Sequence, residues 1–279
     1  MQVKEFVVWS QEGEALRADI RYVETGSKKP VILFLHGLNG FKNWGSFPYV
    51  LEQFARNGII TIAFNFSGSG VGEDLLTFTN LDKYTYNTVT REIEEATDMI
   101  GSILTLDGIP IPLEEIDLSR FGVFGHSLGA GISTIISARI NAVRALAVWA
   151  PVSTFDRFSE RQKSEWKERG YFERENSRTG QMMRLSVELL LDIEHHTAKQ
   201  SILTAAKEFN RPLLIVAGAE DITAPIKEAQ AIHKAAHDSV LHIIHNTGHT
   251  FGAEHPFKGT TTALDEAINL TLTFFKGNL

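Results

Sequence analysis

One serine of the chain stands in a setting that suits a nucleophile. Ser127 is the centre of Gly125-His126-Ser127-Leu128-Gly129, which follows an apolar run at residues 121–124 and precedes a small-residue apolar segment at 130–138. A serine in Gly-x-Ser-x-Gly between a strand and a helix lies on a very tight turn, where the glycines remove Cβ atoms that would clash. The helix that starts there directs free N–H groups and its positive dipole end at nearby negative charge. The pattern predicts a serine hydroxyl held out at the edge of a sheet.

Two later segments supply the groups that such a serine needs. The apolar run at residues 213–217 leads into Gly218-Ala219-Glu220-Asp221, and the run at 240–244 leads into His245-Asn246-Thr247-Gly248-His249. A free serine is a poor nucleophile unless a base such as an imidazole takes its proton. A carboxylate then holds the imidazole in one tautomer and stabilises its charged form. We therefore predict Ser127 as nucleophile, His249 as base and Asp221 as the acid that orients it.

Neighbouring residues offer alternatives for both partner roles. His245 lies four residues before His249 and competes by loop position, although it is nearer the strand. Glu220 adjoins Asp221 and is an alternative acid. Weaker candidates for the acid are Asp192 and Glu194.

Short apolar runs separated by helical segments predict how these side chains are positioned. Residues 6–9 and 16–22 are expected to form an antiparallel hairpin, followed by strands at 31–35, 59–64, 121–124, 145–149, 213–217 and 240–244. Helices are expected over residues 48–56, 86–104, 226–237 and 262–275. This alternation predicts an α/β fold with a mostly parallel central sheet and helices on both faces. Ligands of such sheets bind at the carboxyl ends of the strands, where Ser127, Asp221 and His249 all lie.

The interval from residue 151 to 210 breaks this alternation. No buried strand can be placed in it, and residues 157–178 are crowded with Arg, Lys and Glu. Because it is too long for a plain crossover, we expect a helical cap or lid over the carboxyl edge of the sheet. A solvated pair of helices without a substrate role is the alternative. The expected domains are a core of residues 1–150 and 211–279 and an insertion of residues 151–210.

The composition and charge of the chain limit the binding partners and the cellular location that we expect for it. The 279 residues carry a formal net charge of −7 without a long basic run, which argues against nucleic acid or a membrane as partner. The chain has no cysteine, which excludes disulfides, thiolate-rich metal sites and a cysteine nucleophile. Residues 1–20 lack the pattern of a signal peptide, and no apolar run approaches the roughly 18 residues of a membrane span. We expect a cytoplasmic protein, and a homodimer is left open.

These motifs together resemble the α/β-hydrolase superfamily over nearly the whole chain. The likeness rests on Leu35-His36-Gly37-Leu38-Asn39-Gly40, the Ser127 peptide, the turn at 218–221 and Gly248-His249-Thr250-Phe251-Gly252. Within the superfamily the chain looks most like serine carboxylesterases related to feruloyl esterases and dienelactone-hydrolase-like proteins. True dienelactone hydrolases use a cysteine nucleophile, so their reaction is not carried over. The resemblance favours Asp221 over Glu220 and His249 over His245.

The resemblance also implies an activity and the remainder of a site. The backbone N–H groups of Leu38 and Leu128 would stabilise an oxyanion, and neither a metal nor an organic cofactor would be required. The implied activity is hydrolysis of small to medium acyl esters, aromatic ones included. Alternatives are an exopeptidase or amidase of the acylaminoacyl-peptidase type and a catalytically silent binding protein. Candidates for contact with a small-molecule ester substrate are His36, Phe41, Trp44, His126 and Phe155.

Overall fold

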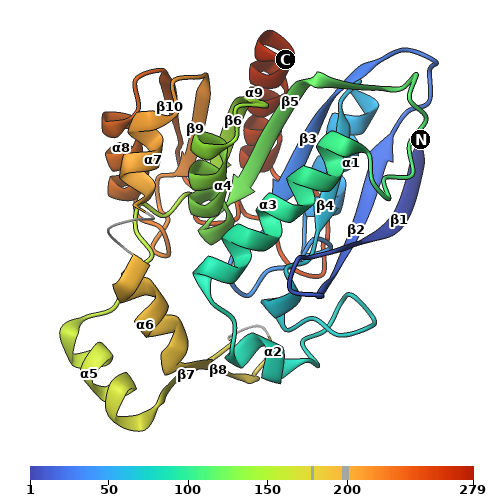
Figure 1. Cartoon of the computed structure of the whole chain (residues 1–279). Coiled ribbons are helices and arrows are strands. Elements are labelled where there is room, and N and C mark those ends of the chain that lie inside the picture. Colours follow the sequence, from blue (N-terminus) through green and yellow to red (C-terminus); the bar gives the residue numbers. More distant parts are fainter. Residues whose placement is uncertain (177–178, 197–200) are drawn as a thin grey trace.

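A central sheet runs through the molecule, as the alternating pattern predicted. The computed structural model describes residues 1–176, 179–196 and 201–279, and within them eight strands form one sheet in the order β1-β2-β4-β3-β5-β6-β9-β10 (Figure 1). The β1–β2 and β2–β4 pairs are antiparallel, and the other pairs are parallel. The strands are β1 (Gln2–Trp9), β2 (Ala15–Tyr22), β3 (Lys29–Leu35), β4 (Ile60–Phe64), β5 (Ile116–His126), β6 (Val143–Trp149), β9 (Leu213–Gly218) and β10 (Ser239–Ile244).

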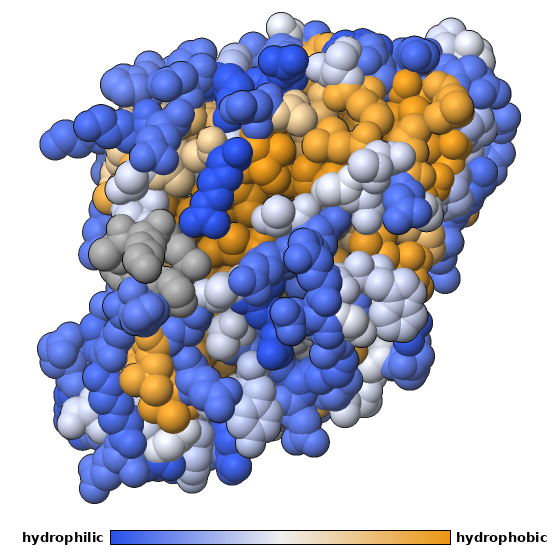
Figure 2. All heavy atoms as spheres, viewed as in Figure 1, coloured by the Kyte–Doolittle hydropathy of each residue, from blue (hydrophilic) through white to orange (hydrophobic). Residues whose placement is uncertain are grey.

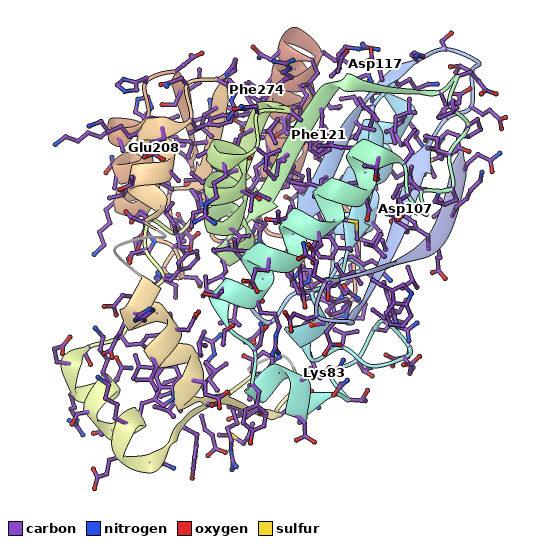
Figure 3. All side chains as sticks on the ribbon, in the orientation of Figure 1. Lys83, Asp107, Asp117, Phe121, Glu208 and Phe274 are labelled. Carbon is purple, nitrogen blue, oxygen red and sulfur yellow. The ribbon has the colours of Figure 1, made fainter. Side chains whose placement is uncertain are left out.

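Helices cover both faces of the sheet, which explains why its central strands are continuously apolar. On one face α3, α4, α7 and α8 contact each other in succession, and on the other α1 contacts α9 (Figure 1). Side chains such as Phe121 of β5 fill the space between the layers (Figure 3). The bounds of these helices are α1 (Phe47–Arg56), α3 (Val89–Thr105), α4 (Leu128–Arg139), α7 (Ile202–Glu208), α8 (Ile226–Ala235) and α9 (Thr262–Asn278).

Helix α4 is the element that holds the predicted nucleophile. Its residues from Gly129 to Ser137 are buried on every side, which is typical of a helix enclosed by other elements. Small residues allow this enclosure: a Cβ atom at Gly131 would lie 3.1 Å from the Phe155 ring. The N-terminus of α4 is therefore held firmly at the carboxyl edge of the sheet.

The segment between β6 and β9 departs from the prediction in one respect. It contains α5 (Glu160–Arg169), the strands β7 (Tyr171–Glu175) and β8 (Met182–Ser186), and α6 (Val187–His196), followed by α7. The strands pair as an antiparallel hairpin, so the prediction that this interval holds only helices is wrong. Buried Met183 and Leu185 lie on either side of exposed Arg184 in β8, but buried Ser186 and the charged residues of β7 obscure this period-two pattern. Residues 177–178 and 197–200 of the interval lie outside the described part of the chain.

The unit of α5, β7, β8 and α6, called the insertion below, lies beyond the carboxyl edge of the sheet (Figure 1). Side chains fill the space between α5 and α6 (Figure 3). The rings of Phe158, Trp166 and Phe172 contact one another. Polar side chains of the insertion bind the core. The Gln181 side chain donates to the Phe78 carbonyl at 2.8 Å, and the Asp192 carboxylate accepts from the Thr90 amide at 3.1 Å.

A short helix, α2 (Leu81–Thr85), and a single 3₁₀ turn, η1 (Ser67–Ser69), precede α3. Helix α2 contacts both η1 and β8. It therefore lies between the core and the insertion. Among the described residues, every helix is too short or too polar to cross a membrane.

Candidate active site

Ser127 lies on a strained turn between β5 and α4. Its φ of 58° and ψ of −119° fall in a region that non-glycine residues rarely adopt. A Cβ atom at Gly125 would lie 2.6 Å from the Gly129 carbonyl, and one at Gly129 would lie 2.5 Å from the Leu35 carbonyl. Only glycine fits at these two positions, which is the reason for the Gly-x-Ser-x-Gly spacing.

Asp221 and His249 are joined by a short hydrogen bond. Nδ1–H of the imidazole donates to Oδ2 of the carboxylate at 2.7 Å. The other carboxylate oxygen accepts from the amides of Thr223 and Ala224, each at 2.8 Å. Gly218 lets the two loops approach, because a Cβ atom there would lie 2.6 Å from the Thr247 carbonyl. The carboxylate is thus fixed by three donors and in turn fixes the imidazole.

The electrostatic setting keeps this carboxyl ionised. Burial by itself raises the pKa of Asp221, but the hydrogen bond and charge of His249 and the amides of Ala224 and Thr223 lower it by more. The net pKa lies below the usual value for aspartate. Asp221 is therefore a carboxylate at neutral pH, as is needed to stabilise a charged imidazole.

The loop that carries His249 rests directly on the turn that carries Ser127. Nε2–H of His126 donates to the His249 carbonyl at 3.0 Å, and the two imidazole rings are 4.8 Å apart. Ser127 and His249 line the same two cavities. The structure therefore brings together the three residues that the sequence predicted.

The alternative residues lie elsewhere. His245 and Glu220 are exposed to solvent. Asp192 binds the start of α3, and Glu194 pairs with Lys167. None of the four lines either cavity.

The segment after β3 packs against the Ser127 turn. A Cβ atom at Gly37 would lie 2.8 Å from the Ser127 Cβ and 3.3 Å from the Leu128 nitrogen. Leu38 and Leu128 both line the larger cavity. As the first residue of α4, Leu128 has an N–H group without an intrahelical acceptor. This arrangement is suited to binding a negatively charged oxygen.

His36 holds this segment in place rather than meeting a ligand. Its Nδ1–H donates to the Gly37 carbonyl at 3.0 Å, and its Nε2 accepts from the Phe66 amide at 3.4 Å. Complete burial lowers the pKa of His36 to about 4, so the ring is neutral and this tautomer is maintained.

Two cavities meet at Ser127, His249 and Leu38. The larger, of about 580 Å³, lies between the core and the insertion, and the smaller measures about 40 Å³. Among the predicted substrate-binding residues, Phe155 lines the larger cavity, and Trp44 and His126 line the smaller. His36 and Phe41 line neither. This corrects their assignment: His36 orders the loop, and Phe41 is buried against Phe78 and His255.

The family follows from comparison with known proteins. A family model described as the alpha/beta hydrolase family matches residues 32–262. The chain belongs to this family. No curated protein sequence matches the chain.

Solved structures share the alpha/beta hydrolase fold at low identity. The hydrolase GrgF from Penicillium has a TM-score of 0.75 and 16% identity, with 100% of this chain and 99% of that chain covered. Est1E from Butyrivibrio proteoclasticus with bound ferulic acid has a TM-score of 0.70 and 16% identity over 97% and 96% of the two chains. The acylaminoacyl peptidase of Pyrococcus horikoshii has a TM-score of 0.69 and 19% identity; all of this chain matches 42% of that chain.

Sequence reasoning missed the polar wall of the larger cavity in this alpha/beta hydrolase. A signal existed for one member, because Glu92 interrupts the apolar face that Val89, Ile93 and Ala96 form on α3. The other members come from short loops and from the hairpin, which had no clear pattern. The missed polar residues are Asn39, Tyr84, Asn87, Thr88, Glu92, Arg157, Gln162, Arg174, Glu175, Asn176 and Thr223.

Within the described ranges, no three His, Asp or Glu side chains come together as metal ligands would. His233 and His237 are four residues apart, the spacing of paired metal ligands on one face of a helix. Helix α8 ends at Ala235, so His237 lies beyond it, and His233 hydrogen-bonds to Ser239 at 2.7 Å.

Proposed function

We propose that this alpha/beta hydrolase is a serine carboxylesterase that acts on small to medium acyl esters, aromatic ones included. The observation that carries the proposal is the 2.7 Å hydrogen bond between Asp221 and His249, on the wall of a cavity that Ser127 also lines. The apolar side chains around this cavity suit an acyl group. They include Leu38, Leu128, Val152, Phe155, Phe158, Phe172, Leu185, Leu189 and Ile193.

The proposed reaction proceeds through an acyl-enzyme. His249 takes the proton of the Ser127 hydroxyl as its oxygen attacks the acyl carbon. The carbonyl oxygen becomes an oxyanion that accepts hydrogen bonds from the N–H groups of Leu38 and Leu128. His249 then returns the proton to the leaving alcohol, and a water molecule releases the acid by the same steps in reverse. Asp221 stabilises the imidazolium at both stages.

A substitution at Ser127 tests this proposal most directly. We expect Ser127→Ala to abolish hydrolysis of short p-nitrophenyl esters and covalent labelling by a fluorophosphonate. Ser137→Ala is the matched control, because Ser137 lies on the same helix with its hydroxyl unbonded within the described residues. Unchanged ester turnover in Ser127→Ala would overturn the assignment of the nucleophile. Absence of labelling in the folded wild type would indicate a catalytically silent binding protein.

An amidase or exopeptidase is the second candidate, favoured by the fold shared with the Pyrococcus horikoshii peptidase. Matched p-nitrophenyl esters and p-nitroanilides with the same acyl group separate the two. We expect the ratio of kcat/KM values to favour the ester. Dominant cleavage of the anilide would replace the esterase proposal.

A further inference from the structure

A tyrosine of the short helix α2 binds the turn that carries the Leu38 amide. The Tyr84 hydroxyl donates to Oδ1 of Asn39 at 2.6 Å, and Asn39 directly follows Leu38. The Asn39 side chain makes no other hydrogen bond within the described ranges. Asn39 lines both cavities, and Tyr84 lines the larger one. This single bond therefore joins α2 to the place where the two cavities meet.

The turn of residues 37–40 has a backbone conformation that needs support. The Gly40 amide closes the turn by donating to the Gly37 carbonyl at 3.0 Å, and Asn39 has a φ of 57°. A positive φ at the third residue of a turn suits glycine or asparagine and is unfavourable for other side chains. Leu38, the second residue, directs its N–H to no acceptor in the described part of the chain. The conformation of Asn39 thus helps to determine where this N–H lies.

Tyr84 is itself held firmly by packing. Only 2% of the residue is exposed, and a Cβ atom at Gly70 would lie 2.9 Å from the Tyr84 Cβ. Gly70 ends η1 with a φ of 82°, and the absence of a side chain there lets α2 pack closely against η1. Tyr84 is therefore a fixed point, to which the half-buried Asn39 is attached.

The groups around Tyr84 set the direction of its hydrogen bond. Burial raises the pKa of Tyr84 to about 12, although the charge and the hydrogen bond of Arg174 oppose the rise. An arginine can only donate, so the phenol oxygen accepts from Arg174 and its proton remains for Asn39. Glu92 on the same cavity wall does not compete as an ion partner of Arg174, because burial and the neighbouring Glu95 carboxyl raise the pKa of Glu92 to about 8. At neutral pH the Tyr84 hydroxyl therefore remains a donor to Asn39.

We propose that Tyr84 is a positioning residue, which acts through Asn39 on the oxyanion-binding N–H of Leu38. This inference rests on the proposed esterase function. Tyr84 contacts no reacting atom in this scheme, because its oxygen is bound by Arg174 and its proton by Asn39. Its contribution is to place an amide that must meet the oxyanion in the transition state.

Tyr84→Phe tests the proposal, because it removes the hydroxyl and keeps the ring. We expect kcat for p-nitrophenyl esters to fall about tenfold while KM changes by less than about twofold, since a misplaced N–H weakens binding of the transition state more than binding of the ester. Tyr86→Phe is the matched control, because Tyr86 is 54% exposed at the C-terminal end of α2. Equal kcat in the two variants would overturn the proposal.

Variants of Asn39 test whether Tyr84 acts through the turn. In Asn39→Ala the Tyr84 hydroxyl has lost its acceptor, so adding Tyr84→Phe should lower kcat no further. Asn39→Gly should retain more activity than Asn39→Ala, because glycine adopts a positive φ without the steric cost of a Cβ. Additive losses in the double variant, or equal activity of the glycine and alanine variants, would contradict action through the turn.

A measurement on the resting protein separates this inference from the proposed function. NMR can follow hydrogen exchange of the Gly40 amide, which closes the turn. We expect this exchange to be several-fold faster in Tyr84→Phe than in the wild type and in Tyr86→Phe. Faster exchange supports the positioning of the turn by Tyr84 even if Ser127 proves not to be the nucleophile. Equal exchange in all three proteins opposes it even if esterase activity is found.

Discussion

Single residues of the site act mainly by fixing the backbone conformation of the loops and the protonation states of neighbouring side chains. The glycines at 37, 125, 129 and 218 each stand where a Cβ atom would collide with a neighbouring loop or turn. Sequence alone predicted Ser127, Asp221 and His249, because each follows a recognisable strand end. It could not predict that Phe41 lies behind the cavity wall, because its orientation depends on Phe78 and His255, which are distant in the chain.

Gly37→Ala tests the position of the Leu38 amide. The added Cβ would lie 2.8 Å from the Ser127 Cβ, so the loop must move away from Ser127. We expect kcat for p-nitrophenyl esters to fall roughly a hundredfold, as for loss of one oxyanion donor. Gly101→Ala on α3 is the control, since its Cβ would meet no atom within 4 Å. Equal activity of the two variants would show that this loop does not support the reaction.

The raised pKa of Glu92 predicts how stability depends on pH. The folded state keeps the Glu92 proton up to about pH 8, whereas the unfolded chain loses it near 4.5. The folded state therefore binds more protons in this window, and this group's contribution to stability falls as pH rises, by up to about 1.4 kcal/mol per pH unit. Urea unfolding at several pH values should show a steeper fall of stability in the wild type and in exposed Glu94→Gln than in Glu92→Gln, where the raised pKa of Glu95 still contributes. The same slope in all three proteins would contradict the assignment.

At the scale of elements, the spacing of apolar residues along the chain determined which strands and helices could be predicted from the sequence. Strands such as β3 and β9 are continuous apolar runs and were predicted closely. The β7–β8 hairpin was missed because its apolar residues are few. One of them, Phe172, packs against Trp166 of α5, and a local sequence pattern does not reveal such a contact.

Contact between α6 and α3 is expected to hold the insertion over the cavity. Asp192 accepts hydrogen bonds from the amide and hydroxyl of Thr90, in the first turn of α3. Loss of such a helix-terminal bond typically costs about 1 kcal/mol. Asp192→Ala should therefore speed amide hydrogen exchange in α6 and raise KM more than it lowers kcat. Glu188→Ala, at an exposed position of the same helix, should change neither, and identical exchange in both variants would argue against a fastening role.

On the scale of the whole molecule, the site depends on loops from opposite parts of the sheet. Most of the insertion surface is hydrophilic, whereas apolar residues gather on the core above it (Figure 2). The arrangement is consistent with a core that supplies the reacting groups and an attached unit that closes the cavity. Helix α7, which the limits of 151–210 predicted from sequence include in the insertion, packs on α4 and α8.

A buried ion cluster ties the loop that carries Leu38 to strand β2 of the sheet. Lys42 is 1% exposed, and its ammonium group binds the Asp19 carboxylate of β2 at 2.6 Å, where Arg21 also pairs with Asp19. The Lys42 amide donates to Oδ1 of Asn65 at 2.7 Å. These contacts join the loop that carries Leu38 to strand β2 and to the end of β4.

Lys42→Met should therefore weaken both the fold and the site. Removing one member of a buried ion cluster leaves the remaining buried charges without a full set of opposite charges, which lowers the free energy of unfolding by about 3 kcal/mol. Lys83→Met is the control, because Lys83 pairs with Glu14 in a partly exposed bridge, of the kind usually worth less than about 1 kcal/mol (Figure 3). Urea unfolding should show a larger loss of unfolding free energy for Lys42→Met than for Lys83→Met. Ester turnover, measured at a temperature where both variants remain folded, should fall only for Lys42→Met. If Lys42→Met loses stability but keeps full kcat, the cluster supports the fold without positioning the loop, and the Leu38 amide must be held by His36 instead.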